Sequence, residues 1–359
     1  VDGMMTPRRG RPSTSVSSTP TRSTNSRALK AFLRYAFSLT LAAVFIYWAF
    51  EGIDLTTIWQ AARQSSTGWL AMIVLTTLCT VAIRAWRWVV LLKGVTRVVT
   101  VTDATLALAI CYSANIVAPR AGEAARALSL KWQRDVSVSA TIGTVVVERI
   151  LDMVWLIFFV GLSLSVIPGR LETEYPLLVS GSLLMLGGCA LLAALLAYAC
   201  ATGESGIEIA EVQLSRISAR IAGPAAEILR KFVVGLTSVS GKGAYVRIFV
   251  SSAILNAGYV LIIYESFCAF GLHQSHSLGA AAALVVMAIS SIGIVIPVQG
   301  GIGAYHFLFA NTLETLYSVD AAAALACATV VHALGNITYL TIGVPALLLQ
   351  RYQSRRNAA

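Results

Sequence analysis

A chain of 359 residues, of which 57% are hydrophobic and only 12% are charged, is too apolar to be a soluble globular protein. Its formal net charge of +10 does not indicate a nucleic-acid partner, because most of the excess lies in the two tails and in short charged loops, as positive-inside topology predicts. The six cysteines are scattered through apolar runs, which excludes a secreted disulfide framework and a site of paired metal ligands.

Residues 1–30 contain six basic side chains among Ser, Thr and Pro, and little apolar sequence. Low apolar content together with like charge predicts a disordered basic tail on the cytoplasmic side of the membrane. A cleaved signal peptide is the alternative, but no small-residue cleavage site follows the apolar run from Tyr35 to Phe50.

A transmembrane domain is predicted over residues 31–350, because a helix needs about 20 apolar residues to cross the bilayer core. Residues 202–246 carry basic residues between apolar ones at helical spacing, which predicts a cytoplasmic amphipathic linker. Residues 351–359 are predicted to be a basic cytoplasmic tail. Six segments are predicted to be full spans, at about 31–50, 66–89, 137–168, 175–201, 246–270 and 321–350.

The second span ends in an aromatic and basic sequence, Arg84-Ala-Trp-Arg87-Trp, which is followed by Lys93. Side chains of this kind are typical of a membrane interface, so the sequence places both arginines at the cytoplasmic surface. Glu265, near the outer end of the fifth span, is also interpreted as an interface residue.

Two further apolar segments, 104–134 and 277–320, are each interrupted by a Pro-x-x-Gly sequence. Proline removes a backbone donor and glycine permits unusual φ angles, so both sequences break a helix at membrane depth. The run 104–119 would reach only about 24 Å as a helix, short of the roughly 30 Å core. Re-entrant hairpins are predicted, with two short spans as the alternative for 277–320. Broken helices usually line a substrate pathway, which makes Gly300 and Gly301 candidate binding residues.

The predicted fold is an all-α integral membrane protein, a polytopic bundle of about six full spans and two re-entrant or broken-helix hairpins. The halves 31–168 and 175–350 would run in opposite directions as an inverted repeat, which is a transporter architecture. The similarity of 144–152 to 329–336 supports this relation. The distribution of basic residues predicts a multi-pass protein of the inner membrane with both termini in the cytoplasm.

The stretch from Pro119 to Arg126 is predicted to open a helix, and it carries Arg120, Glu123 and Arg126. Free amide groups at a helix N-terminus, together with two arginines, can hold a phosphate or an acidic headgroup. The alternative is that the two arginines only pair with Glu123 at the inner interface.

The third span contains three charged residues, Glu148, Arg149 and Asp152. Glu148 and Asp152 are four residues apart and share one helical face. Charges inside a span are costly, face the protein interior and usually mark function. A structural ion-pair cluster with Arg120 or Arg126 is the alternative, and the two interpretations are compatible.

Three motifs stand out, Pro119-Arg120-Ala121-Gly122-Glu123-x-x-Arg126, Val147-Glu148-Arg149-x-x-Asp152 and Pro297-x-x-Gly300-Gly301-x-Gly303. They resemble the transmembrane region of lysylphosphatidylglycerol synthase/flippase proteins, over nearly the whole chain after residue 30. The resemblance implies an integral membrane protein that, in the best-understood members, moves a modified phospholipid between leaflets. Relatives are linked to polyprenyl- or glycolipid pathways.

The sequence departs from this family at two histidines. The family often has a glutamate where this chain has His306 and an arginine near the position of His332. Two imidazoles can replace such a pair if the residues touch, since they can share a hydrogen bond without the desolvation cost of a fixed ion pair. An unperturbed pKa of roughly 6.5 would let them change charge near physiological pH. Both are candidate site residues, and neutral packing is the alternative.

The predicted function is that of a flippase-like transporter, in which Arg120 and Arg126 hold a phosphate while Glu148 and Asp152 meet a cationic headgroup or a proton. An intramembrane enzyme acting on a polyprenyl- or glycolipid substrate is the alternative. A scaffold for a separate lipid-modifying synthase is a third possibility. No catalytic residue, cofactor or metal is predicted, because the sequence has no triad, nucleotide-binding or metal-ligand motif.

The expected partners are a membrane lipid with an anionic or phosphate-bearing headgroup, and a second copy of the chain or a separate lipid-modifying enzyme. The soluble aminoacyl-transferase domain that the synthases carry is not part of this sequence. Lipid aminoacylation is therefore not expected of this chain alone.

Overall fold

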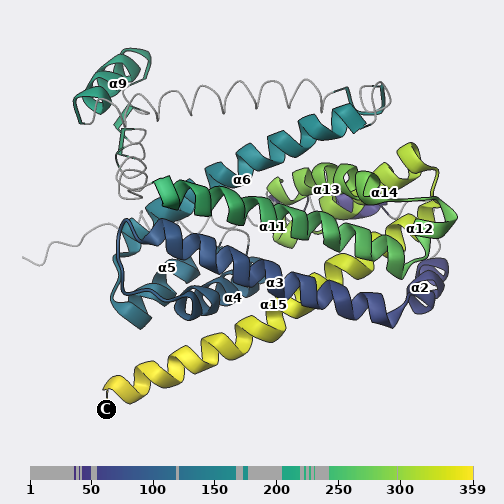
Figure 1. Ribbon diagram of the computed structural model, residues 1–359, viewed down its shortest axis with the longest axis horizontal. Coiled ribbons are helices and arrows are strands. Elements are labelled where there is room, and N and C mark those ends of the chain that lie inside the picture. Colours follow the sequence, from purple (N-terminus) through teal and green to yellow (C-terminus); the bar gives the residue numbers. More distant parts are fainter. Residues whose placement is uncertain are drawn as a thin grey trace, which may run out of the picture.

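The computed structural model describes residues 55–118, 121–166, 173–176, 204–218, 242–296 and 298–358, together with parts of 36–49 and 222–230. The predicted basic tail 1–30, half of the first span and almost all of the fourth span lie outside these residues. Every regular element in the described part is a helix (Figure 1), so the prediction of an all-α membrane fold is confirmed.

The described helices vary in length from short connecting turns to long apolar rods. In chain order they are α2 (Leu55–Gln64), α3 (Thr67–Leu92), α4 (Val101–Val117), α5 (Ala121–Arg134), α6 (Val138–Val166), α9 (Glu204–Ile217), α11 (Lys242–Ala269), α12 (Leu272–Ser275), α13 (Ala280–Val295), the 3-10 turn η1 (Gln299–Gly301), α14 (Ala304–Tyr317) and α15 (Ala321–Ala358).

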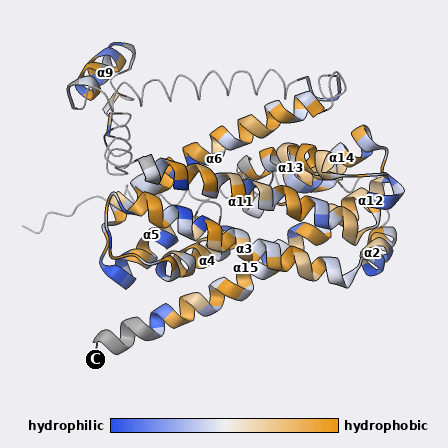
Figure 2. Cartoon of the chain, viewed as in Figure 1, coloured by the Kyte–Doolittle hydropathy of each residue, from blue (hydrophilic) through white to orange (hydrophobic). Residues whose placement is uncertain are grey.

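Among the described helices, α3, α11 and α15 are both long and apolar enough to cross a bilayer. The helix α6 has a similar length of 29 residues, but it contains the three charged residues of the third predicted span. Apolar residues run along these helices, whereas hydrophilic residues gather at α5 and, at the opposite end of the bundle, at α2 and α12 (Figure 2). This distribution is the one expected of a bundle that spans a membrane.

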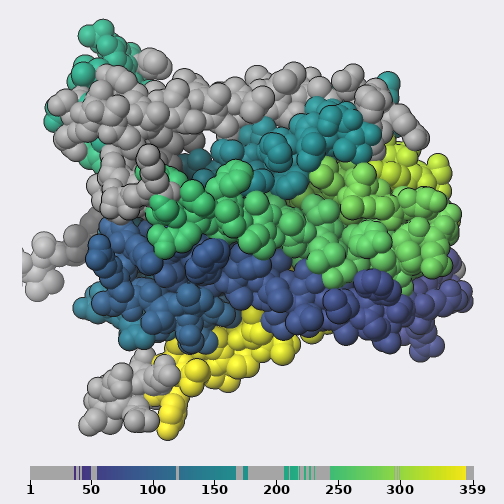
Figure 3. Space-filling view, viewed as in Figure 1, coloured from purple at the N-terminus to yellow at the C-terminus, as the bar shows by residue number. Residues whose placement is uncertain are grey.

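The helices α3 and α11 pack along each other in antiparallel directions. The backbone N–H of Ser66, just before α3, donates to the carbonyl of Ala269 at the end of α11 over 2.8 Å. A Cβ atom added to Gly258 of α11 would lie 2.7 Å from Thr80 Cγ2, so the close approach of the two helices requires glycine there. The pair lies side by side on the face seen in Figure 3, in blue and green.

Two helical hairpins enter the bundle from opposite ends. The first consists of α4 and α5 and opens where α3 ends and α6 begins, whereas α13 and α14 open next to α12 and the start of α15 (Figure 1). Their helices have 17, 14, 16 and 14 residues and so reach about 21–26 Å, short of the roughly 30 Å core. Both predicted broken-helix hairpins are confirmed, and the lengths favour a hairpin over two short spans for 277–320.

Each hairpin is joined to the next long helix by a short link. Residues 135–137 connect α5 to α6, and residues 318–320 connect α14 to α15. Both links contain a residue in the left-handed region, Asp135 and Ser318, each with a φ of 55°. The chain therefore reverses direction within three residues at both places.

The helix α15 packs against both hairpins. A Cβ atom added to Gly343 would overlap the carbonyl oxygen of Ala109 and the Oγ of Ser113 on α4, so the two helices are in close contact here. Ser113 Oγ also donates to the carbonyl of Tyr339 over 2.9 Å. The helix continues to Ala358, through the basic residues that the sequence assigned to a tail.

Candidate functional site

Five charged side chains from three helices meet inside the bundle. They are Arg84 and Arg87 from α3, Arg126 from α5, and Glu148 and Asp152 from α6. The three arginines and Glu148 are buried, and the Asp152 side chain is 16% exposed. Arg84 and Arg87 are three residues apart, and Glu148 and Asp152 are four apart. Each pair therefore occupies one face of its helix.

Glu148 is the centre of these contacts. Its Oε2 accepts from Arg126 Nη1 over 2.8 Å, and its Oε1 lies 3.4 Å from Arg84 Nε and 3.5 Å from Arg87 Nη2. Asp152, one turn along α6, binds the Nη2 atoms of the same two α3 arginines, at 2.6 Å each. Two carboxylates are thus shared among three arginines in the interior of the bundle, where charges attract each other more strongly than at the surface.

Arg149 and Glu123 form the exposed edge of this cluster. Arg149 Nη2 lies 2.9 Å from Glu123 Oε1, and the two side chains are 41% and 26% exposed. Arg149 also lies 3.6 Å from Asp152 Oδ2. Although Arg149 follows Glu148 in the sequence, the two do not pair, because neighbouring residues on a helix point about 100° apart.

The cluster holds more positive than negative charge. Four guanidinium groups, those of the three buried arginines and Arg149, face the carboxylates of Glu123, Glu148 and Asp152. Arg126 also stacks over the ring of Trp88 at 4.8 Å. Four buried N–H donors of the cluster have no hydrogen-bond acceptor among the described residues, namely Nε of Arg84, Nε of Arg87 and both Nε and Nη2 of Arg126, although Arg84 Nε lies 3.4 Å from Glu148 Oε1. A net positive charge with unused donors suits an anion such as a phosphate.

The first helical break lies beside the cluster. The backbone N–H of Gly122 donates to Asn115 Oδ1 over 2.8 Å, and a Cβ atom on Gly122 would overlap the Cys111 carbonyl. This contact closes the α4–α5 hairpin at its tip. The predicted binding residue Arg120 lies outside the described residues, so its place in the cluster stays a prediction.

The second break is built on glycines with positive φ, Gly300 (57°), Gly301 (76°) and Gly303 (86°), which only glycine adopts without strain. His332 Nε2 donates to the Gly300 carbonyl over 2.8 Å, and the Gly303 N–H donates to His306 Nδ1 over 3.2 Å. The two imidazole rings touch, with centroids 4.8 Å apart. The predicted contact between His306 and His332 is confirmed. Each ring, however, forms its hydrogen bond with the backbone of the break.

A line of side chains connects the two regions. Arg84 Nη1 donates to the hydroxyl of Tyr112 over 3.2 Å, and the Tyr112 ring stacks on Tyr339 at 4.4 Å. Tyr339 lies seven residues after His332 on α15, so the two share one face of that helix. The charged cluster and the second break are therefore linked through α4 and α15.

Burial adds to two interpretations of the sequence. Arg84 and Arg87 are buried members of the cluster, and Glu265 is 1% exposed, so none of the three side chains faces a membrane surface. A signal was present, because Thr76, Thr80, Arg84 and Arg87 follow each other at helical spacing within an otherwise apolar span. A polar face of this kind indicates a buried contact rather than a membrane surface.

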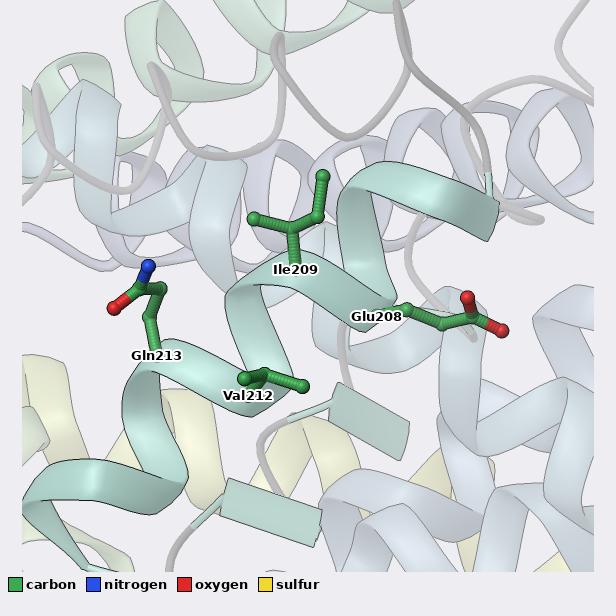
Figure 4. Close-up of a pocket in the computed structure, with 4 residues that line it drawn as sticks. All are labelled: Glu208, Ile209, Val212 and Gln213. Carbon is green, nitrogen blue, oxygen red and sulfur yellow. The ribbon is translucent and has the colours of Figure 1, made fainter.

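An open pocket occurs elsewhere, on α9. Ile209, Val212, Glu208 and Gln213 line it, all from adjacent turns of this one helix (Figure 4). Ile209 and Val212 are 53% and 55% exposed. No residue of the charged cluster or of the second break lines this pocket, which makes it a weaker candidate for the functional site.

Comparison with known proteins gives one family and one curated relative. The chain matches the family described as "Lysylphosphatidylglycerol synthase TM region" over residues 35–343. It is similar to a protein named glycosyltransferase AglD from Haloferax volcanii, with 26% identity over 277 residues. The alignment covers 68% of this chain and 43% of the relative, so the chain spans less than half of that protein's length. No solved structure matches the chain.

Proposed function

Because the chain belongs to the family of the lysylphosphatidylglycerol synthase transmembrane region, we propose that it is a flippase-like transporter of a lipid with a phosphate-bearing headgroup. The observation that carries this proposal is the buried cluster with its excess guanidinium group and unused donors. Buried charges at membrane depth are expensive and usually mark a substrate pathway.

The phosphate would bind where the unused donors point. Arg126 supplies two of them and Arg87 a third, and a phosphodiester offers oxygen acceptors for such charge-assisted hydrogen bonds. The exposed pair Arg149–Glu123 lies at the edge of the cluster, where a headgroup would enter. Glu123 would then release Arg149 to the ligand, since a phosphate competes for the same donors.

The two broken hairpins supply the route between leaflets. They enter from opposite ends of the bundle, and the Arg84–Tyr112–Tyr339 contacts and the face shared with His332 connect the cluster to the second break. Polar groups along such a route would let a headgroup cross while its chains stay in lipid. Transporters with hairpins of this kind bind substrate at the breaks.

The name of the curated relative favours a second candidate, an intramembrane enzyme acting on a lipid-linked sugar. Such an enzyme needs a carboxylate that is free to exchange a proton with substrate. Here Glu123, Glu148 and Asp152 are each bound to at least one arginine, which disfavours this role. Mass spectrometry of lipids incubated with the protein separates the two candidates, because a transporter leaves headgroups unchanged.

The direct test is lipid movement in liposomes. The purified chain should accelerate exchange of labelled phosphate-bearing lipids between leaflets, and should do so more for some headgroups than for others. A panel of phospholipids and prenyl phosphates identifies the class. If no lipid of the panel moves faster than in protein-free liposomes, the transporter proposal is wrong; binding without movement would favour a scaffold for a separate lipid-modifying enzyme.

A matched pair of variants assigns the activity to the cluster. Arg149→Gln should reduce transport, whereas Arg134→Gln should leave it near the level of the unmodified chain. Both arginines are ion-paired and similarly exposed, at 41% and 43%, but Arg134 pairs with Asp103 outside the cluster. Equal losses in the two variants would mean that transport responds only to surface charge.

A further inference from the structure

A second buried carboxylate, Glu265 on α11, lies outside the charged cluster. It is 1% exposed, and its Oε1 accepts a hydrogen bond from Thr76 Oγ1 of α3 over 2.8 Å. Its Oε2 is buried and has no hydrogen-bond partner among the described residues. Buried polar atoms normally have a partner, so an orphaned carboxyl oxygen of this kind requires an explanation.

The helices around Glu265 supply no counter-charge. On α3, Arg84 is eight residues beyond Thr76, or about 12 Å along the helix, and it is bound to Asp152. The helix α13 has no titratable residue in its sequence. Within the described part of the chain, no cationic group lies within ion-pair distance of Glu265.

The other titratable groups near Glu265 are weakly polar or engaged elsewhere. Cys268 lies on the same helix, and Cys327 of α15 donates to the Ser266 carbonyl over 3.8 Å. His273 of α12 lies 3.4 Å from the Phe267 carbonyl through Nδ1. The charged residues of α6 all belong to the cluster. An ionised Glu265 would therefore be a buried charge that no described residue compensates.

We propose that Glu265 is a proton-binding site, occupied by a proton in the conformation described here. A metal cation is a poor alternative, because it needs several oxygen ligands and, among the described residues, only Thr76 bonds to Glu265 through a side-chain oxygen. Glu265 lies four residues before the end of α11, which is about 6 Å along the helix from the α12 end of the bundle. The proton would exchange with water at that end.

A proton at this position would be coupled to movement of the α3–α11 pair. Glu265 of α11 bonds to Thr76 of α3 across the interface between these helices. Arg87 of α3 bonds across the same interface, because its Nη1 donates to Ser252 Oγ of α11 over 3.1 Å. Ionisation of Glu265 would favour opening of the α3–α11 interface to water. Opening this interface would shift Arg87, which belongs to the charged cluster. This coupling, unlike the proton site itself, rests on the proposed transport function.

Carbodiimide labelling tests the site independently of transport. Dicyclohexylcarbodiimide adds to a protonated carboxyl in lipid: the carboxyl oxygen bonds to the central carbon, its proton moves to a nitrogen, and rearrangement leaves a stable N-acylurea. Peptide mass mapping should find this adduct on Glu265, with less of it as pH rises, and none in Glu265→Gln. The matched control Glu314→Gln, at an exposed carboxylate of α14, should leave labelling of Glu265 intact.

Infrared spectroscopy covers the case in which the reagent cannot reach the site. The carbonyl band of a protonated carboxyl should be present in the unmodified protein, be lost in Glu265→Gln and remain in Glu314→Gln. If the spectra of all three proteins lack such a band, Glu265 is ionised and the proposal is wrong. The same holds if the band is present but survives Glu265→Gln.

The coupling has its own readout. In liposomes, an imposed pH gradient should change the rate of lipid movement by the unmodified chain, and Glu265→Gln should lose this response. A protonated Glu265 together with a transport rate that ignores the gradient would refute the coupling but keep the site. Absence of transport in every condition would refute the proposed function while leaving the labelling result valid.

Discussion

Glu148 lies within 3.5 Å of three arginines and is completely buried. Glu148→Gln keeps the shape of the side chain but removes its negative charge, so the guanidinium group of Arg126 loses its carboxylate partner. Removing one partner from a buried ion pair costs on the order of 3–5 kcal/mol. We expect a loss of this size in the free energy of unfolding, measured in detergent, while Glu314→Gln at an exposed site should change it by about 0.5 kcal/mol or less.

Arg149 and Glu123 should behave differently, because their pair is partly exposed. Arg149→Leu and Glu123→Gln should each lower the free energy of unfolding by about 1 kcal/mol or less. Both should nevertheless impair lipid transport if a headgroup enters the cluster at this edge. The double variant should restore stability but not transport, and recovery of transport in it would show that the pair is only structural.

The two histidines make a third prediction at this scale. His306→Glu alone buries a carboxylate and His332→Arg alone adds a cation, whereas together they can pair. The ring centroids are 4.8 Å apart, so the new side chains can meet while still bonding to Gly303 and Gly300. In a double-mutant cycle, the double variant should lose less free energy of unfolding than the two single variants lose together, by about 0.5–3 kcal/mol. Additive losses would contradict this coupling.

At the scale of helices, the contact of α15 with α4 depends on Gly343. A methyl group there would overlap the Ala109 carbonyl, so Gly343→Ala should force the helices apart and lower the free energy of unfolding by roughly 1–3 kcal/mol. Gly335, on the same helix, has nothing within 4 Å of an added Cβ. Gly335→Ala should be neutral or stabilising by about 0.5–1 kcal/mol, because alanine favours helix. Denaturation of both variants in detergent checks the contrast.

At this scale, some features could be predicted from the sequence and others could not. Apolar length and the Pro-x-x-Gly interruptions are local properties, and they correctly predicted the described long helices α3, α6, α11 and α15 and both hairpins. The charges of α6 were correctly placed in the interior because a span cannot leave them in lipid. Arg126 was among the partners that the sequence suggested, but Arg84 and Arg87 were not, since they come from a helix more than sixty residues earlier in the sequence. Only helix packing brings them to Glu148.

At the scale of the whole molecule, the two halves repeat one contact with different chemistry. Glu123, the third residue of α5 from Ala121, meets Arg149, the twelfth of α6 from Val138. His306, the third residue of α14 from Ala304, meets His332, the twelfth of α15 from Ala321. This equivalence supports the predicted inverted repeat. One half carries a charged pair beside the cluster, and the other carries two imidazole rings.

The orientation in the membrane stays a prediction from the basic residues. A single cysteine at Gln274 in α12 should react with an impermeant maleimide added outside intact cells, in a chain without its native cysteines. A cysteine at Asp135, at the opposite end of the bundle, should not react until the cells are opened. The reverse pattern would place both termini outside and overturn the predicted topology.

The three-residue links 135–137 and 318–320 determine how the molecule can move. A link of this length spans roughly 10–14 Å when fully stretched, and both already reverse the chain. Neither has slack to let a hairpin slide along the long helix that follows it. We therefore expect each hairpin to move as one rigid unit with the long helix that follows it.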